Sequence, residues 1–281
     1  MNTVQERILE IYKCIKCICD NKQIPYYAIG GTAIGAVRHN GFIPWDDDID
    51  IAIPIEYYWY FFKCAEEQLP SYYSIKHCRN DRYYVFPFGK IIDERTTFIE
   101  EWEKGFTNLY KGVFVDLMPI AGVPGDNSQQ KKYMSRLLRY ILMNRWRRIP
   151  ASCSVTRSAF LIKCVFKLPL LMFTRDYFFD KYMNLLARNP FYKSNMTGYT
   201  WGLYNEKTIM FPTEIFLETI DIPFEDTYMK CPAGYDKMLS IQFNDYMKLP
   251  PEDQRVSIHS PFIDLNTPYK EYVIKDFRGR K

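Results

Sequence analysis

Apolar residues recur at helical spacing near the start of the chain. Isoleucines stand three or four positions apart between Ile8 and Ile18, so they fall on one face of an amphipathic helix. Thr3 followed by Glu6 has the form of a capping box, in which two side chains satisfy the first free N–H groups of a helix. The pattern predicts a helix over residues 3–20 that packs on the rest of the protein.

Short apolar runs bounded by turn residues predict strands in the first half of the chain. These runs lie at residues 25–29, 48–53, 72–78, 83–92 and 113–118. Residues 32–38 are expected to form one or two helical turns, and residues 55–69 an aromatic helix closed by Pro70. This alternation predicts an α/β or α+β catalytic half.

The pattern changes after Pro124-Gly125. Residues 127–148 interleave Lys and Arg with apolar residues, which predicts a basic amphipathic helix suited to phosphates or lipid. Residues 159–173 are apolar, but they are interrupted by two lysines and a proline and are shorter than the roughly 20 residues of a membrane span. We favour a helix buried in the domain here, with attachment to a membrane surface as the alternative.

Composition and charge limit the function classes. The 281 residues are 47% hydrophobic and 25% charged, as in a globular protein, and a net charge of +4 is too small to predict nucleic-acid binding. The eight cysteines are scattered and no secretory signal pattern begins the chain, which predicts a cytoplasmic location. Cys14, Cys17 and Cys19 lie together, but without a second CxxC or HxxxH a buried helix face is favoured over a zinc site.

Carboxylates alternate with isoleucines in the run from Trp45 to Ile51. In a strand that extends far enough, Asp46, Asp48 and Asp50 would point to one face. Carboxylates so close repel each other unless a cation lies between them, and an oxygen-rich site is what Mg²⁺ or Mn²⁺ prefers. We interpret the run as a metal site, with a solvated acidic turn as the alternative.

A glycine pair precedes the predicted short helix. Free backbone N–H groups and the helix dipole favour an anion at such a position, so Gly30, Gly31 and Thr32 are candidates to hold a phosphate. A plain turn is the alternative. Arg38 ends the short helix, where it would either neutralise a leaving phosphate or cap the last carbonyls, and both interpretations stay open.

A single carboxylate, Asp116, interrupts the apolar run at residues 113–118. An unpaired buried carboxylate is costly, so it requires a metal, a base or a hydrogen-bonding partner. Asp116 is therefore the third catalytic candidate. The alternative is a structural Asp held by local backbone donors.

The longest motif, GGTAIGAVRHNGFIPWDDDIDI over residues 30–51, resembles the signature of the LicD-type phosphocholine transferase family, which is related to the fukutin group. Further similarity is found at Lys90–Asp93, Val115–Ile120 and between Pro223 and Pro251. The resemblance covers most of the chain and is weakest over residues 127–205. The chain departs from the family pattern at Phe243-Asn244, where relatives often have Tyr-Gly. The resemblance therefore does not extend to this loop, which is expected near the acceptor.

The resemblance implies a nucleotidyltransferase-like fold, with a small mixed sheet flanked by helices and a helical insertion and extension. Residues 1–125 are expected to form the catalytic core. Residues 126–205 would be a basic helical segment that meets the acceptor or a membrane surface, and residues 206–281 would pack on the core.

It also implies a Mg²⁺- or Mn²⁺-dependent enzyme of lipopolysaccharide or capsule biosynthesis, which moves a phospho-substituent such as phosphocholine from a CDP-linked donor to a hydroxyl of a cell-surface glycan. The candidate catalytic residues and metal ligands are Asp48, Asp50 and Asp116. The candidate donor-binding residues are Gly30, Gly31, Thr32, Arg38 and Lys90. Asp116 is also the candidate acceptor of the hydroxyl proton.

The expected partners are this donor and a glycan acceptor, without nucleic acid. The basic segment suggests a lipid-linked acceptor, and peripheral association with the inner face of a membrane. Two other functions stay open: a nucleotidyltransferase that uses a nucleoside triphosphate and releases pyrophosphate, and a non-catalytic glycan-binding scaffold. The reaction products distinguish the nucleotidyltransferase from the expected transferase. A change in stability or donor binding on adding metal distinguishes the expected transferase from the scaffold.

Overall fold

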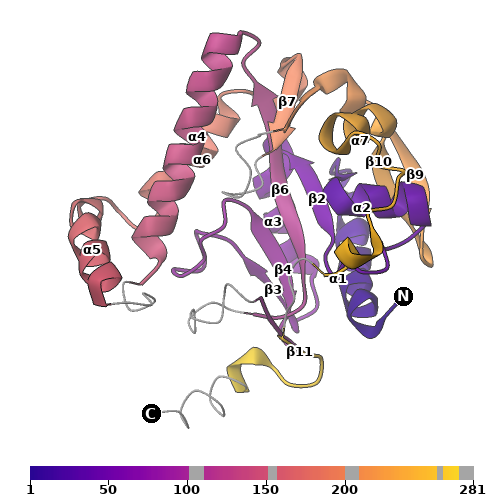
Figure 1. The fold of residues 1–281 in the computed structure, drawn as a ribbon, viewed down its shortest axis with the longest axis horizontal. Coiled ribbons are helices and arrows are strands. Elements are labelled where there is room, and N and C mark those ends of the chain that lie inside the picture. Colours follow the sequence, from indigo (N-terminus) through magenta and orange to yellow (C-terminus); the bar gives the residue numbers. More distant parts are fainter. Residues whose placement is uncertain (101–110, 151–156, 200–208, 258–261, 272–281) are drawn as a thin grey trace.

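The computed structural model of the protein describes residues 1–100, 111–150, 157–199, 209–257 and 262–271. Within these ranges a mixed sheet of seven strands is flanked by helices (Figure 1). The predicted α+β class is confirmed.

The sheet is built around one long buried strand. Its strands, in spatial order, are β1 (Tyr27–Ala28), β2 (Asp50–Pro54), β6 (Phe114–Val123), β4 (Gly89–Asp93) and β3 (Tyr73–Lys76), with β7 (Met196–Tyr199) and β8 (Ile209–Pro212) continuing from β6. β2 and β6 are parallel, and every other neighbouring pair is antiparallel. All ten residues of β6 are buried, as expected for a strand covered on both faces.

The N-cap of the first helix, α1 (Thr3–Lys22), lies one residue before the predicted cap. Asn2 is the N-cap: its side chain accepts a hydrogen bond from the Gln5 backbone N–H, and the Gln5 side chain accepts one from the Asn2 backbone N–H. The predicted Thr3 capping box is therefore wrong, because Asn and Gln in the same spacing satisfy these donors. The helix ends at Lys22, and its C-cap, Gln23, adopts the left-handed conformation.

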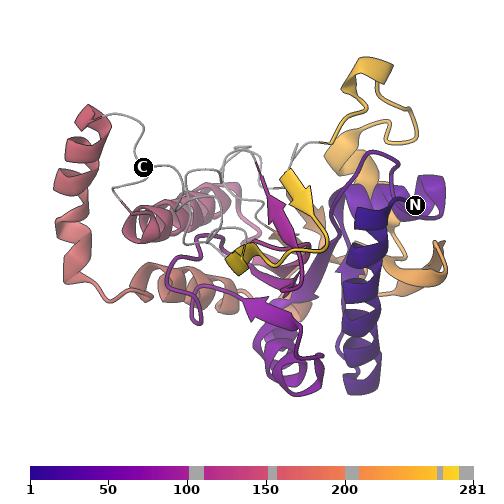
Figure 2. The same ribbon diagram turned by 90° about the horizontal axis from the view of Figure 1, so that it is seen from below.

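Helices α1 and α3 (Ile55–Gln68) lie side by side against one face of the sheet (Figure 2). Helix α6 (Tyr177–Ala187) packs beside α3, and the long α4 (Asn127–Arg148) lies against α6 (Figure 1). The predicted helices at 55–69 and 127–148 are confirmed. The strand expected at 83–92 begins only at Gly89.

Short elements complete the fold. They are α2 (Gly30–Ile34), the π-helical turn η1 (Gly35–His39), β5 (Thr97–Ile99), η5 (Phe191–Lys193), η6 (Thr213–Phe216), β9 (Thr219–Phe224), β10 (Thr227–Pro232), α7 (Tyr235–Phe243), η7 (Glu252–Gln254) and β11 (Phe262–Asp264). Strands β9 and β10 form a hairpin that packs beside β1, and β11 pairs with β5.

The apolar segment at 159–173 departs from its favoured interpretation. It forms α5 (Arg157–Lys167) and the 3₁₀ turn η4 (Pro169–Met172), and many of its large apolar side chains are exposed. The expectation of a helix buried in the domain is therefore wrong. Among the described residues, no helix is long and apolar enough to cross a membrane.

The cysteine cluster lies on α1, as expected, but it is not a uniformly buried face. Cys19 is buried, Cys14 is half-buried and Cys17 is exposed. Within the described ranges, no group of three His, Cys, Asp or Glu side chains is placed to hold a metal ion, so nothing in these ranges supports a zinc site.

Candidate active site

Asp50 and Asp116 are register partners on the parallel strands β2 and β6. The Asp116 backbone N–H donates to the Ile49 carbonyl at 2.9 Å, which extends this pairing one residue before β2. Both aspartates are buried. Two carboxylates separated by more than sixty positions in the sequence are thus brought to neighbouring strands in the middle of the sheet.

Lys90 faces Asp116 from the other neighbouring strand. The two residues are register partners across the antiparallel β4–β6 ladder, and Lys90 Nζ lies 3.0 Å from Asp116 Oδ1. Both side chains are almost fully buried, and the ammonium lies 3.3 Å from the centre of the Phe114 ring. A buried ion pair of this kind leaves a costly unpaired charge if either partner is lost.

The protonation of Asp116 is set by this environment. Burial raises the pKa of Asp116 to about 6, the Lys90 ammonium acts to lower it, and the negative charge of Asp48 acts to raise it. Glu100, a buried acid that the sequence analysis did not select, raises it further. A carboxylate with a pKa near 6 suits proton transfer at neutral pH better than a solvated aspartate does.

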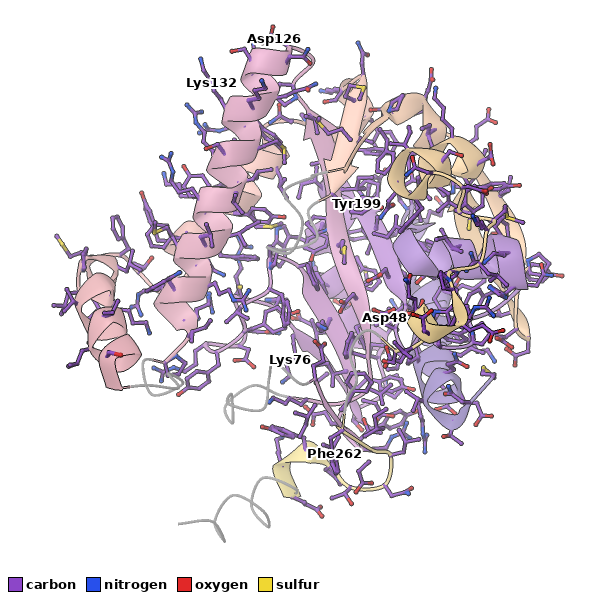
Figure 3. All side chains as sticks on the ribbon, viewed as in Figure 1. Asp48, Lys76, Asp126, Lys132, Tyr199 and Phe262 are labelled. Atoms are coloured by element: carbon purple, nitrogen blue, oxygen red, sulfur yellow. The ribbon has the colours of Figure 1, made fainter. Side chains whose placement is uncertain are left out.

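Asp48 and Asp46 precede the strand instead of lying within it. β2 begins at Asp50, so the expected strand alternation does not extend to these two residues. Asp48 is half-buried and is labelled in Figure 3 near the centre of the molecule. Its influence on the pKa of Asp116 indicates that the two carboxylates are close enough to interact.

Thr32 holds the acid pair in place. Its Oγ1 accepts a hydrogen bond from the Asp50 backbone N–H at 2.8 Å, and Thr32 is buried in α2. The hydroxyl that was expected to hold a phosphate thus fixes the start of β2. Its role in donor binding stays a prediction.

Different structural features favour glycine at position 30 and at position 31. Gly30 has φ 57°, in the left-handed region that favours glycine. At Gly31 a Cβ atom would lie 2.7 Å from Asp46 Oδ2, so a larger residue would collide with that carboxylate. A carboxylate therefore borders the predicted phosphate position, and phosphate binding by Gly30 and Gly31 stays a prediction.

Other residues anchor the acidic run on its outer side. Gln5, buried in the first turn of α1, donates from Nε2 to the carbonyls of Ile43 at 3.2 Å and Asp46 at 2.9 Å. Ser257 donates from Oγ to Asp47 Oδ2 at 2.5 Å. Gln5 thus joins the cap of α1 to the acidic run, a contact that the sequence pattern did not predict.

Arg38 binds a carboxy-terminal segment. Its Nη1 donates to the Tyr246 carbonyl at 2.6 Å, and its Nε donates to His39 Nε2 at 3.0 Å. Burial lowers the pKa of the guanidinium. The hydrogen bonds of Arg38 to the backbone run to distant carbonyls and not to the end of its own helix, while its role toward a leaving phosphate stays a prediction.

Tyr58 is a further residue that the sequence analysis missed. Its hydroxyl accepts from the Gly89 N–H at 2.7 Å and donates to the Leu117 carbonyl at 2.8 Å. Gly89 and Leu117 are register partners next to Lys90 and Asp116, so the hydroxyl bridges β4 and β6 beside the ion pair. Burial raises the pKa of Tyr58, which keeps the hydroxyl protonated as a donor.

The donor atoms of the site suit a hard divalent cation. Asp48, Asp50 and Asp116 offer carboxylate oxygens, but no three acids of the described ranges converge closely enough to hold an ion alone. Mg²⁺ is usually bound through one or two carboxylates together with substrate phosphates. The residues therefore fit a metal whose coordination a phosphate-bearing substrate completes, and not a preformed cage.

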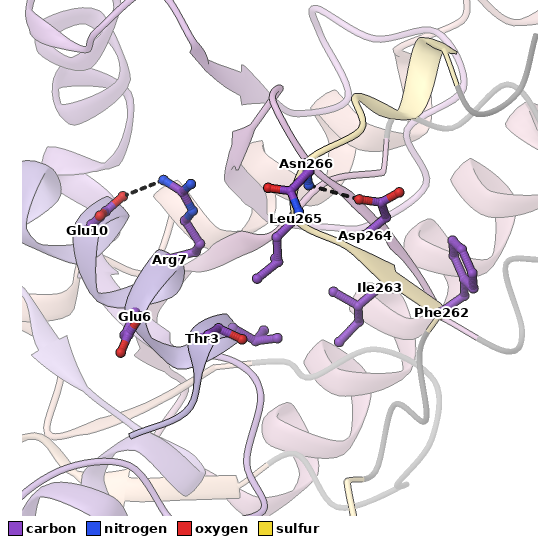
Figure 4. Close-up of a pocket in the computed structure, with 10 residues that line it drawn as sticks. Thr3, Glu6, Arg7, Glu10, Phe262, Ile263, Asp264, Leu265 and Asn266 are labelled. Atoms are coloured by element: carbon purple, nitrogen blue, oxygen red, sulfur yellow. Dashed lines mark hydrogen bonds and ion pairs between the residues drawn. The ribbon is translucent and has the colours of Figure 1, made fainter.

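An open hollow of about 810 Å³ lies elsewhere, between the first turns of α1 and β11 (Figure 4). Its lining mixes acids with Arg7, which is paired with Glu10 at 3.2 Å. None of the candidate catalytic residues lines it. It is separate from the acid site.

The matched region contains every candidate residue of this site. Residues 23–136 match the family model described as LicD/FKTN/FKRP, nucleotidyltransferase domain. The chain carries a LicD-type domain. The predicted resemblance to this family is confirmed.

Proteins similar to the chain extend the LicD-type likeness beyond the domain. The lipopolysaccharide cholinephosphotransferase LicD of Haemophilus influenzae is 29% identical over 260 residues, which are 89% of this chain and 92% of that protein. An uncharacterized protein of Rickettsia typhi is 36% identical over 92 residues, which are 32% of this chain and 29% of that protein. The first of these spans the helical segment and the carboxy-terminal part as well as the LicD-type domain.

Proposed function

We propose that this protein transfers a phospho-substituent such as phosphocholine from a CDP-linked donor to a hydroxyl of a cell-surface glycan, as in lipopolysaccharide or capsule biosynthesis. The observation that carries the proposal is the pairing of Asp50 with Asp116, and of Asp116 with Lys90, inside the LicD-type domain. The similarity to a lipopolysaccharide cholinephosphotransferase over 89% of the chain supports the substrate class.

In this reaction the acceptor hydroxyl oxygen attacks the phosphorus that bears the substituent. The bond from this phosphorus to the oxygen of cytidine monophosphate breaks, and the nucleotide leaves with the bonding electrons. Asp116, whose pKa is about 6, accepts the hydroxyl proton at a carboxylate oxygen. Lys90 holds Asp116 in position and supplies a fixed positive charge beside the transferred phosphoryl group.

The remaining candidates bind and orient the donor. Asp48 and Asp50, with Asp116 beside them, would hold Mg²⁺ or Mn²⁺, which supplies charge neutralisation to a diphosphate when bound. Thr32 keeps Asp50 in register with Asp116 through its hydrogen bond to the Asp50 amide. We propose that Arg38 supports the leaving nucleotide indirectly, by fixing the segment at Tyr246.

The decisive experiment measures cytidine monophosphate released from a panel of CDP-linked donors. The panel contains CDP-choline, CDP-ethanolamine and CDP-linked polyols, each with and without glycan, and with Mg²⁺, Mn²⁺ or a chelator. We expect one donor to release the nucleotide in a glycan-dependent and metal-dependent manner. If the chelator leaves turnover unchanged, the proposed metal dependence is wrong, while the proposed transfer reaction still stands.

The description of the matching model favours one second candidate, a nucleotidyltransferase that acts on a nucleoside triphosphate. Its product is pyrophosphate, so the same preparation is assayed for pyrophosphate release from the four triphosphates. If pyrophosphate is released from a triphosphate and no CDP-linked donor releases cytidine monophosphate, the nucleotidyltransferase function replaces the main proposal. If the protein binds glycan but releases neither cytidine monophosphate nor pyrophosphate, the result supports the non-catalytic scaffold.

A further inference from the structure

Helix α5 and the turn η4 expose a continuous set of large apolar side chains. They are Leu161, Ile162, Val165, Leu168, Leu171 and Met172, each more than half exposed. Leu161 and Val165 are four positions apart and so share one face of α5, and Leu168 follows three positions later, directly after the helix end, with αR backbone angles. We call these six residues the α5 surface.

Such a set of apolar side chains is unusual on the solvent-exposed surface of a protein. Isolated exposed apolar residues are common, but a contiguous patch marks a site of contact with a partner or a membrane. In both Figure 1 and Figure 2, α5 stands at the edge of the molecule, away from the central sheet. The α5 surface is thus accessible to something outside the described parts of the chain.

The charge around the α5 surface is strongly one-sided. Residues 127–175 contain eleven Lys and Arg and no Asp or Glu, although the whole chain has a net charge of only +4. Two of the eleven, Arg175 and the buried Arg148, pair with Asp176, which leaves nine other basic residues in the stretch. This stretch includes all of α4, α5 and η4. A basic helical region beside an apolar face is the composition of segments that lie in the interface of an anionic lipid bilayer.

Two other occupants fit these observations less well. A second copy of the chain meeting the same surface across a two-fold axis would bring two positively charged regions together. A nucleic acid would use the charges, but it would leave the aliphatic side chains without an apolar environment. An anionic bilayer satisfies both features, because its headgroups meet the charges and its acyl chains receive the aliphatic groups.

We propose that the α5 surface docks this protein on an anionic phospholipid membrane, with α5 lying in the plane of the interface and the exposed basic residues of 127–175 against the headgroups. The helix is too short to span a bilayer, so the attachment is peripheral. The inference does not depend on the transfer reaction, since docking is measured without donor or glycan.

The test uses the full-length protein and sedimentation with vesicles. One vesicle preparation contains phosphatidylglycerol and phosphatidylcholine in equal parts, and the other contains phosphatidylcholine alone. We expect binding to the anionic vesicles at least ten times stronger than to the neutral ones, and weakening as salt is added, because salt screens exposed charges. Equal binding to both, or binding to neither, would overturn the proposal.

The double variant Val165→Asp/Leu168→Asp tests the α5 surface itself, because both side chains are 64% exposed and their replacement leaves the fold intact. The matched control is Leu217→Asp/Tyr228→Asp, at two positions 59% and 55% exposed outside this region. Both variants lower the net charge equally. We expect vesicle binding to fall at least ten-fold in the first and to be retained in the second.

Two results with these variants would contradict the membrane assignment. The first is an equal loss of vesicle binding in both, since the effect would then come from net charge alone. The second is lipid-free self-association of the wild type that the first variant abolishes while vesicle binding persists. The α5 surface would then be an interface between copies of the chain. Circular dichroism and thermal unfolding verify that both variants fold.

Discussion

Lys90 and Asp116 form a buried ion pair across the β4–β6 ladder, with 3.0 Å between Nζ and Oδ1. Replacing Lys90 by Met leaves the Asp116 carboxylate buried without its cation, so we expect a loss of about 3 kcal/mol in the free energy of unfolding. The kcat should fall by about 10²-fold, because the fixed charge beside the phosphoryl group is lost. Urea unfolding and nucleotide release measure the two effects.

Lys76→Met is the matched control for this prediction. Lys76 lies opposite Lys90 on β3, but its Nζ is 3.9 Å from Glu94 and more exposed. We expect little change in stability or turnover there. In the double variant Lys90→Met/Asp116→Asn, stability should recover relative to Lys90→Met alone, and an additive loss would contradict the pairing.

The acid pair is tested by Asp48→Asn and Asp50→Asn. Each change removes a negative charge with little change in shape, so we expect turnover to fall by more than about 10²-fold while the fold is kept. The control is Asp47→Asn, because Asp47 is engaged by Ser257. Full activity in either of the first two variants would exclude that carboxylate from catalysis.

Thr32→Val distinguishes positioning of Asp50 from direct donor binding. Without Oγ1 the buried Asp50 N–H loses its acceptor, so we expect about 2 kcal/mol of destabilisation and a lower kcat with the KM for donor nearly unchanged. Thr32→Ser keeps the acceptor and should restore both. A raised KM for donor at unchanged stability would instead indicate that Thr32 binds a phosphate.

Local patterns in the sequence predicted the elements that carry the site. Isoleucine spacing predicted α1, the basic run predicted α4 with its bounds, and the burial cost of a lone carboxylate predicted a partner for Asp116. These features depend on neighbours in the chain. The likeness to a known family then indicated which acids belong together.

Long-range relationships were not predictable in the same way. The register that places Asp50 beside Asp116, and Lys90 opposite it, is set by the whole sheet. The bonds from Gln5 to the acidic run join segments about forty positions apart. The α5 surface was misjudged because an apolar run has the same pattern whether it meets a protein core or a lipid surface.

Tyr58→Phe tests the hydroxyl bridge between β4 and β6. Its loss leaves the Gly89 N–H and the Leu117 carbonyl without their hydroxyl partner, so we expect about 2 kcal/mol of destabilisation and reduced kcat through displacement of the ion pair. Tyr84→Phe is the control, because the buried Tyr84 hydroxyl has no hydrogen-bond partner within the described ranges. Similar losses in both variants would assign the effect to general packing.

His77 makes the stability of the fold depend on pH. Burial lowers its pKa from 6.5 to about 4, and the nearby Arg79 charge acts in the same direction. Its Nδ1 accepts backbone hydrogen bonds from Arg79 at 3.2 Å and Asn80 at 3.3 Å, so protonation there would break both. The folded state holds this imidazole neutral.

The sign follows from proton linkage. Between pH 6.5 and about 4 the unfolded chain binds a proton at His77 that the folded state does not, so stability is lost as the pH falls through this range. The loss is about 2 kcal/mol near pH 5. His77→Asn keeps an acceptor near the same position but does not titrate, so its acid-induced loss should be smaller by that amount. Urea unfolding across the range measures the difference, and identical pH profiles for the two proteins would refute the assignment.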